Sequence, residues 1–203
     1  MGEGWRHFRE ADEARWERFQ PSRNHYSIDL MTLSNDLPIR KTANISRDGL
    51  YRYELTRRWG EREDDLLPFV MLNPSDADAE RDDPTIRRCM EFARREGASG
   101  IIVANLFAWR TPYSDELRQA DDPFGRDNRK ALEMIAARSI ENGMPIVCAW
   151  GCRGAFHGGD KSALDIIRGV GPGAILKCLG KTKAGHPRHP LYLRRDQSFE
   201  AFP

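Results

Sequence analysis

The strongest constraint on the fold of this chain is a regular alternation of short apolar runs and helical patterns in its C-terminal part. The apolar runs, each of a length typical of a buried strand, cover residues 66–72, 101–107, 145–150 and 174–179. The helical patterns between them cover residues 83–97, 126–140 and 161–168. Parallel strands need long crossover connections such as these helices. The order predicts a three-layer α/β/α domain around a mainly parallel, four-stranded central sheet.

The first predicted helix has clear signals at both ends. Asp83 can cap it, Pro84 suits its first turn, and Gly97 can end it. Residues 50–55 alternate between apolar and polar side chains, which predicts one more strand, joined to the sheet edge. We therefore place a single α/β domain at residues 50–203.

The preceding residues, 1–49, differ in texture and are predicted to be an N-terminal extension. Its aromatic residues recur at near-helical spacing among charges, at Trp5, Phe8, Trp16 and Phe19. This spacing predicts an amphipathic helix that ends before Pro21. Little periodicity follows, so the rest of the extension is expected to be irregular.

Charge and hydropathy exclude several classes of protein. The 203 residues include 32 Lys and Arg against 31 Asp and Glu, a net charge of +1, so nucleic acid could be bound only through a local basic patch. No apolar run approaches the roughly 18 residues that span a bilayer. The first 20 residues mix five acids with four arginines, unlike a targeting peptide. We expect a cytoplasmic protein with no membrane partner.

The four cysteines do not form a recognisable metal or disulfide pattern. Cys89, Cys148, Cys152 and Cys178 are widely spaced, and no C-x-x-C pair occurs. A zinc site could combine the last three with His157, His186 and His189, but structural zinc sites usually have shorter ligand spacings. Buried, reduced thiols are the simpler interpretation, and we expect no bound metal or other cofactor.

Polar residues follow each predicted strand, at the sheet edge where ligands bind in such folds. Asn73 precedes a proline, where it could hold a water or a substrate carbonyl, or simply form an Asx turn. The last strand leads into residues 180–191, a stretch with two histidines and several cations. That stretch is either an anion or phosphate site or a solvated loop.

Other candidate chemistry is weaker. Asp76, Asp78, Asp82 and Asp83 are close in sequence, and they could cap a helix, bind a metal or act as a base. The glycines at 151–159 match neither the dinucleotide nor the P-loop motif. No G-x-S-x-G nucleophile elbow occurs.

Five motifs follow one another along the chain: VMLNPS at 70–75, DDPTIRRC at 82–89, NLF at 105–107, AWG at 149–151 and HPRHPLYL at 186–193. Together they resemble DUF1643, a bacterial family of unknown function. The resemblance covers about residues 50–196. The family's motifs in turn resemble the uracil-DNA glycosylase superfamily. Members of that superfamily have a G-x-[DN]-P strand end, a strand ending in Asn, a strand ending in Trp-Gly and a late His-Pro-x-Pro-Leu loop.

This second resemblance implies a uracil-DNA-glycosylase-like fold and roles for particular residues. Asn73 would position the attacking water, and Asn105 would read the edge of a flipped base. A loop histidine would stabilise the departing base. We favour His189 over His186 because Pro190-Leu191 follows it.

The same resemblance implies contacts outside the reacting centre. The aromatic residues that could stack on the base are Phe107, Trp109 and Trp150. The residues that could hold phosphates are Ser75, Lys181, Lys183 and Arg188. Leu191 could wedge into the base step.

This chain also departs from the superfamily pattern. Met71 replaces the glycine of the first motif, Asn73 stands where the strongest glycosylases have a carboxylate, and no iron–sulfur ligand set is present. The leading hypothesis is an N-glycosylase-like hydrolase with a nucleobase or nucleic-acid partner. One alternative is a non-catalytic nucleic-acid or nucleotide-binding protein with the same pocket. Another is a metal-dependent small-molecule enzyme that uses the 76–83 acids.

Overall fold

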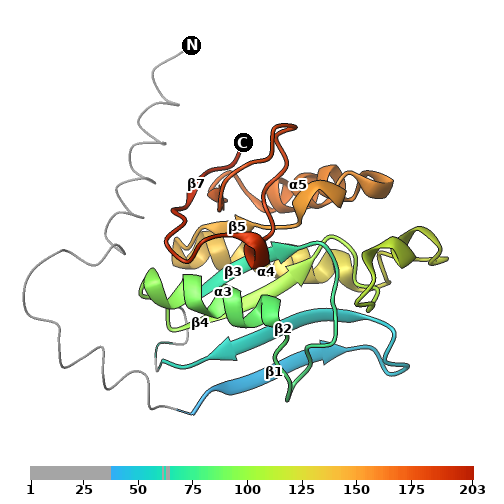
Figure 1. Ribbon diagram of the computed structural model, residues 1–203, viewed down its shortest axis with the longest axis horizontal. Helices are drawn as coiled ribbons and strands as arrows, with labels where there is room; N and C mark the ends of the chain where they lie inside the picture. Colours follow the sequence, from blue (N-terminus) through green and yellow to red (C-terminus); the bar gives the residue numbers. More distant parts are fainter. Residues whose placement is uncertain (1–37, 61, 63–64) are drawn as a thin grey trace, which may run out of the picture.

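The computed structural model describes residues 38–60, 62 and 65–203, which form one seven-stranded sheet (Figure 1). The strand order across the sheet is β1-β2-β4-β3-β5-β6-β7. The strands are β1 (Arg40–Ile45), β2 (Arg52–Arg58), β3 (Leu66–Met71), β4 (Gly100–Asn105), β5 (Ile146–Cys148), β6 (Leu176–Cys178) and β7 (Glu200–Ala201). β3, β4, β5 and β6 run parallel, and β1, β2 and β7 pair antiparallel with their neighbours.

The prediction of a four-stranded sheet was wrong, because three antiparallel strands extend the parallel core. β2 matches the edge strand predicted at 50–55, but β1 covers it on the outside. β1 has no buried side chain, and β7 has only two exposed residues, so neither leaves an apolar pattern in the sequence. Both are held mainly by backbone hydrogen bonds to a neighbouring strand. The predicted helix at residues 5–19 lies outside the described residues.

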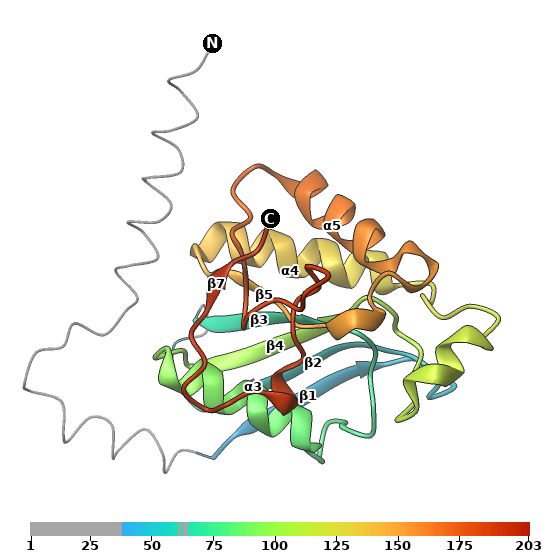
Figure 2. The ribbon, with the colours of Figure 1, turned by 45° about the horizontal axis from the view of Figure 1, so that its top comes forward.

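Helices cover both faces of the sheet, as the three-layer prediction required (Figures 1 and 2). α3 (Pro84–Arg95) packs on one face, and α4 (Asn128–Asn142) and α5 (Gly159–Val170) pack on the other. Side chains alternate along β3, so Phe69 faces α3 and Val70 faces α4 and α5. The predicted cap of α3 is confirmed, since Asp83 accepts a hydrogen bond from the Ile86 amide at 2.8 Å.

The order of the parallel strands creates a crevice at the carboxyl edge of the sheet. From β3 the chain crosses through α3 to β4 on one side, and from β4 it crosses through α4 to β5 on the other side of β3. Connections therefore leave β3 and β5 on opposite faces of the sheet. Open α/β sheets bind their ligands at such a switch point.

Short 3₁₀ helices build the loops around this edge. They are η1 (Ser114–Arg118), η2 (Gly151–Arg153), η3 (Phe156–Gly158) and η4 (Pro190–Tyr192). The η4 turn lies beside α3, where Arg88 donates a hydrogen bond to the Leu193 carbonyl at 2.5 Å. Within the described ranges, no helix is long and apolar enough to cross a membrane.

Candidate functional site

A pocket of about 520 Å³ opens at the carboxyl edge of the sheet. Its walls come from the ends of β3 and β4, the residues after β5, the N-terminus of α3, the segment 111–114, η2 and η4. Arg52 of β2 also lines it. The volume falls within the usual range for small-molecule sites. The pocket therefore lies at the carboxyl edge predicted from the sequence, beside the switch point between β3 and β5.

The structure brings half of the predicted site residues together in this pocket. Those that line it are Asn73, Ser75, Asn105, Trp150, His189 and Leu191. They come from the ends of three strands and from the loop after β6, so the fold brings together residues that lie more than a hundred positions apart in the sequence.

The Asn73 side chain is held in one orientation by its own loop. Its amide nitrogen donates to the carbonyl oxygens of Pro74 at 3.0 Å and Thr111 at 2.8 Å. An amide nitrogen has two hydrogens to donate, so both are used. The remaining polar atom of Asn73 is its amide oxygen, which can only accept a hydrogen bond. A water or a ligand donor would fit that role.

Asn105 is the least satisfied polar side chain of the pocket. It is only 1% exposed, yet neither its amide nitrogen nor its amide oxygen has a partner among the described residues. A buried amide without hydrogen bonds costs about 1–3 kcal/mol. The backbone around it is well held, because the Asn128 amide donates to the carbonyls of Asn105 at 3.1 Å and Leu106 at 3.0 Å. A ligand edge with one donor and one acceptor would satisfy Asn105.

His189 is held as a neutral donor at the wall of the pocket. It caps η4, with its Nδ1 accepting from the Leu191 amide at 3.4 Å. Burial lowers the pKa of His189, and the nearby charge of Asp83 opposes this only in part. A neutral imidazole that accepts through Nδ1 carries its proton on Nε2. His189 can therefore donate through Nε2 to a ligand.

Arg52 is a buried, charged pocket residue that sequence reasoning missed. It is 2% exposed, and its Nη1 donates to the Ala77 carbonyl at 2.5 Å. Its Nε has no partner among the described residues. Burial lowers the pKa of Arg52 to about 10, so the guanidinium is still charged at neutral pH. Arginine side chains normally face solvent, and the local sequence gives no signal that this one is buried.

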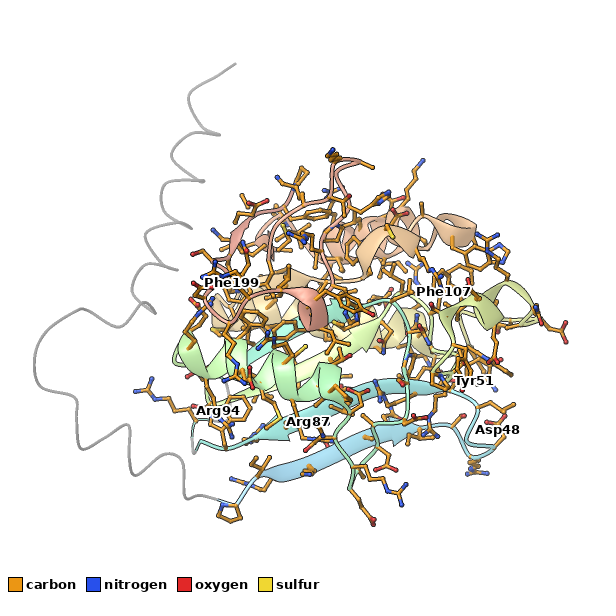
Figure 3. All side chains as sticks on the ribbon, in the orientation of Figure 1. Asp48, Tyr51, Arg87, Arg94, Phe107 and Phe199 are labelled. Atoms are coloured by element: carbon orange, nitrogen blue, oxygen red, sulfur yellow. The ribbon has the colours of Figure 1, made fainter. Side chains whose placement is uncertain are left out.

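Two of the predicted stacking residues lie away from the pocket. Phe107, labelled in Figure 3, is fully buried against Phe124 and Phe156, with ring centroids 5.1 and 5.9 Å away. Trp109 packs edge-on against Tyr51 at 5.5 Å. Trp150 lines the pocket, and its ring contacts Phe202 edge-on at 5.5 Å.

The two lysines and the arginine of the 180–189 loop also lie outside the pocket lining. Lys181 forms an ion pair with Glu200 of β7 at 3.6 Å. The side chains of Lys183 and Arg188 are exposed, and His186 is half-buried. Of the two histidines left open by the sequence, His189 is the one that the structure places in the pocket.

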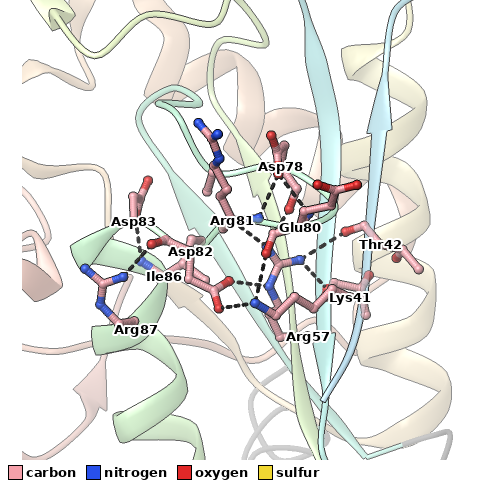
Figure 4. A network of polar contacts seen from close by, with 12 residues as sticks. Lys41, Thr42, Arg57, Asp78, Glu80, Arg81, Asp82, Asp83, Ile86 and Arg87 are labelled. Atoms are coloured by element: carbon pink, nitrogen blue, oxygen red, sulfur yellow. Dashed lines mark hydrogen bonds and ion pairs between the residues drawn. The ribbon is translucent and has the colours of Figure 1, made fainter. Parts of the chain in front are cut away.

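Three of the four acids at 76–83 contact other groups of the fold, Asp83 as the cap of α3. Asp78 accepts from the backbone amides of Glu80 and Arg81, and Asp82 pairs with Arg57 and Lys41 (Figure 4). Within the part of the chain that the structure describes, no group of three or more His, Cys, Asp or Glu side chains could hold a metal ion. Three of the four free cysteines are buried, as the simpler interpretation required.

Comparison with known proteins adds a family but no activity. No curated protein matches the chain, and no solved structure matches it. The likeness to the uracil-DNA glycosylase superfamily therefore rests on the four sequence motifs alone. One family model, described as a protein of unknown function (DUF1643), matches residues 52–191. This match begins at Arg52, ends at Leu191 and covers most of the chain, which therefore belongs to the DUF1643 family.

Proposed function

We propose that this pocket binds a nucleobase and that the protein hydrolyses the N-glycosidic bond of that base. The observation that carries the proposal is the buried amide of Asn105, which lines the pocket with both polar atoms unpartnered. Nucleobases present donors and acceptors side by side on a planar edge, which is the pattern that one amide can satisfy. A hydrocarbon ligand would leave the amide unsatisfied.

His189 supports the bond-breaking step in this proposal. When the C1′–N bond breaks, its electron pair moves onto the base, which leaves as an anion. A hydrogen-bond donor at that anion lowers the barrier, because its interaction is stronger in the transition state than with the bound substrate. The Nε2 hydrogen of His189 can supply this donor, since Nδ1 is held by the Leu191 amide.

Asn73 supports the addition of water. Its amide nitrogen is occupied by two backbone carbonyls, so its oxygen can accept a hydrogen bond from a water near the sugar. The water oxygen bonds to C1′ as the base departs, and the proton that the water loses neutralises the base anion. An amide cannot take that proton itself, so Asn73 orients the water and does not activate it.

The rim of the pocket supports a partner larger than a free base. Leu191 and Tyr192 of η4 are 37% and 79% exposed beside the opening, and both line it. Exposed apolar and aromatic side chains can separate or stack on neighbouring bases of a nucleic acid. The exposed Lys183 and Arg188 belong to the loop that leads into η4 and could contact phosphates.

Base release tests the proposal directly. The full chain is incubated with ribonucleosides, deoxyribonucleosides and single- and double-stranded oligonucleotides with normal, deaminated and mismatched bases, and free base is measured by chromatography. We expect release that Asn73→Ala and His189→Gln each reduce about 100-fold or more. His186→Gln is the matched control, because it removes a histidine of the same loop from outside the pocket. No release from any substrate would contradict the proposal.

A second candidate is a binding protein without hydrolytic activity. Met71 lines the pocket, and Asn73 has no charge to activate a water. This candidate predicts that bases or nucleotides bind, that binding depends on Asn105, and that no base is released. Equilibrium binding measured alongside the release assay separates the two candidates.

A further inference from the structure

We propose that Arg52 makes the pocket selective for bases that present an oxo oxygen next to a ring N–H, such as hypoxanthine, guanine and uracil. This inference rests on the proposed function, since it names the substrate class of the same pocket. It concerns a residue that none of the sequence motifs includes.

Arg52 lines the pocket but is only partly used by the protein. Its side chain makes one hydrogen bond with the described residues, to the Ala77 carbonyl, and its Nε is buried without a partner. No carboxylate in the described part of the chain forms an ion pair with it. Asp83 also lines the pocket, but its carboxylate accepts the Ile86 amide as the cap of α3.

Arg52 can determine whether the ligand atom beside it is a hydrogen-bond donor or an acceptor, whereas Asn105 cannot. An amide side chain can turn over and offer its donor and acceptor in either order. A guanidinium has only donors and keeps its charge, so a ligand atom beside it must be an acceptor. An exocyclic amino group in that place would face a donor with another donor and leave both groups without a hydrogen bond, which weakens binding.

The two side chains together define the base edge that fits. Arg52 would donate to the oxo oxygen, and Asn105 would turn its amide oxygen to the adjacent ring N–H. Hypoxanthine and uracil have that pair of groups, whereas adenine and cytosine have an amino group and a bare ring nitrogen at the corresponding positions. The pocket should therefore separate bases that differ only by this oxo-for-amino exchange.

The test is calorimetric binding of matched free bases to the full chain. We expect hypoxanthine to bind about 10- to 100-fold more tightly than adenine. We expect 1-methyluracil to exceed 1-methylcytosine by a similar factor, the methyl group replacing the N1 hydrogen that would otherwise give cytosine an oxo oxygen next to a ring N–H. Arg52→Met should reduce both preferences to less than about threefold. Arg138→Met is the matched control, because it removes the same charge from an exposed position on α4, outside the pocket, and should leave the preferences unchanged. Thermal unfolding of each variant establishes that it is folded.

Four results would overturn the inference. The first three are equal binding of hypoxanthine and adenine, a preference that survives Arg52→Met, and no binding of any base at millimolar concentration. The fourth is displacement of hypoxanthine by ribose 5-phosphate that is lost in Arg52→Met but kept in Arg138→Met, because Arg52 would then hold a phosphate.

Nucleosides of the same bases test this inference and the proposed hydrolysis independently of each other. Oxo-selective binding without base release from inosine or uridine would leave Arg52 as the selective residue and reject the glycosidic chemistry. Base release from adenosine as fast as from inosine would support the chemistry and reject the role of Arg52.

Discussion

Each end of β2 carries a buried arginine, and the two arginines differ in how many of their donors form hydrogen bonds within the protein. Arg57 is fully buried and saturated: it donates to the Asp82 carboxylate at 2.5 Å and to the carbonyls of Asp78, Arg81, Thr56 and Thr42 (Figure 4). Arg52, at the pocket end, makes one hydrogen bond and keeps its Nε unpartnered.

The difference indicates a separate role for each arginine. Arg57 holds the 78–82 loop against β2 through hydrogen bonds. That loop leads into Asp83 and the start of α3, which forms one wall of the pocket. Arg52 contributes little to this framework. A buried cation needs hydrogen-bond partners, and a ligand that binds in the pocket could supply acceptors for the donors that Arg52 leaves unused.

The largest expected effect on stability comes from replacing Arg57, the arginine whose donors are all used. Arg57→Met should lower the free energy of unfolding by about 3–5 kcal/mol, because it leaves the Asp82 carboxylate and several loop carbonyls without their main donor. Urea unfolding followed by circular dichroism measures it. A loss below about 1 kcal/mol would mean that Arg57 does not hold the loop.

The next effect compares two buried asparagines near the end of β4. Asn105→Leu should raise stability by about 1–2 kcal/mol, because it removes an amide with two unpartnered atoms. Asn128→Leu should lower stability by about 1–3 kcal/mol, because the Asn128 amide donates to two backbone carbonyls. The pair is measured in the same urea series. Equal losses in both variants would show that Asn105 is satisfied within the fold.

A smaller effect is expected at the unsaturated end of β2. Arg52→Met should change the free energy of unfolding by less than about 1 kcal/mol, because the lost hydrogen bond to Ala77 is offset by removal of a desolvated charge. The same titration as for Arg57→Met gives the comparison. A loss as large as that of Arg57→Met would make Arg52 part of the framework.

The smallest effect concerns pH. Burial lowers the pKa of His189 below its usual 6.5, so the unfolded chain takes up a proton before the folded protein does. The contribution of His189 to stability should be constant above about pH 6.5 and should decline as the pH falls below it. Thermal unfolding between pH 5 and 7 should show a weaker pH dependence in His189→Gln than in wild type. An unchanged dependence would place His189 in solvent.

The parts of the fold that could be predicted from the sequence are those whose buried side chains leave an apolar pattern. The apolar runs of β3 and β4 and the capped start of α3 could be read directly, because buried strands and Asp-Pro helix starts leave local patterns. β1 and β7 could not, since pairing at a sheet edge depends on backbone hydrogen bonds and not on side-chain type.

The same limit applies to the site. Asn73 and Asn105 could be placed because each follows a buried strand, and strand exits meet at one edge. Phe107 follows β4 too, but its ring turns into the core between the sheet and α5, where it would contact any side chain added at Gly159. The position of Arg52 at the pocket could not be predicted, because it depends on the antiparallel pairing of β2 with β4, which no local sequence pattern specifies.

A crystal structure of the full chain soaked with hypoxanthine would show whether a base occupies the space between Asn105 and Arg52. We expect density for the ring in the pocket, with the oxo oxygen within about 3 Å of a guanidinium nitrogen of Arg52 and the ring N–H facing the Asn105 amide. Ordered waters that satisfy both side chains, with no base bound at saturating concentration, would contradict it.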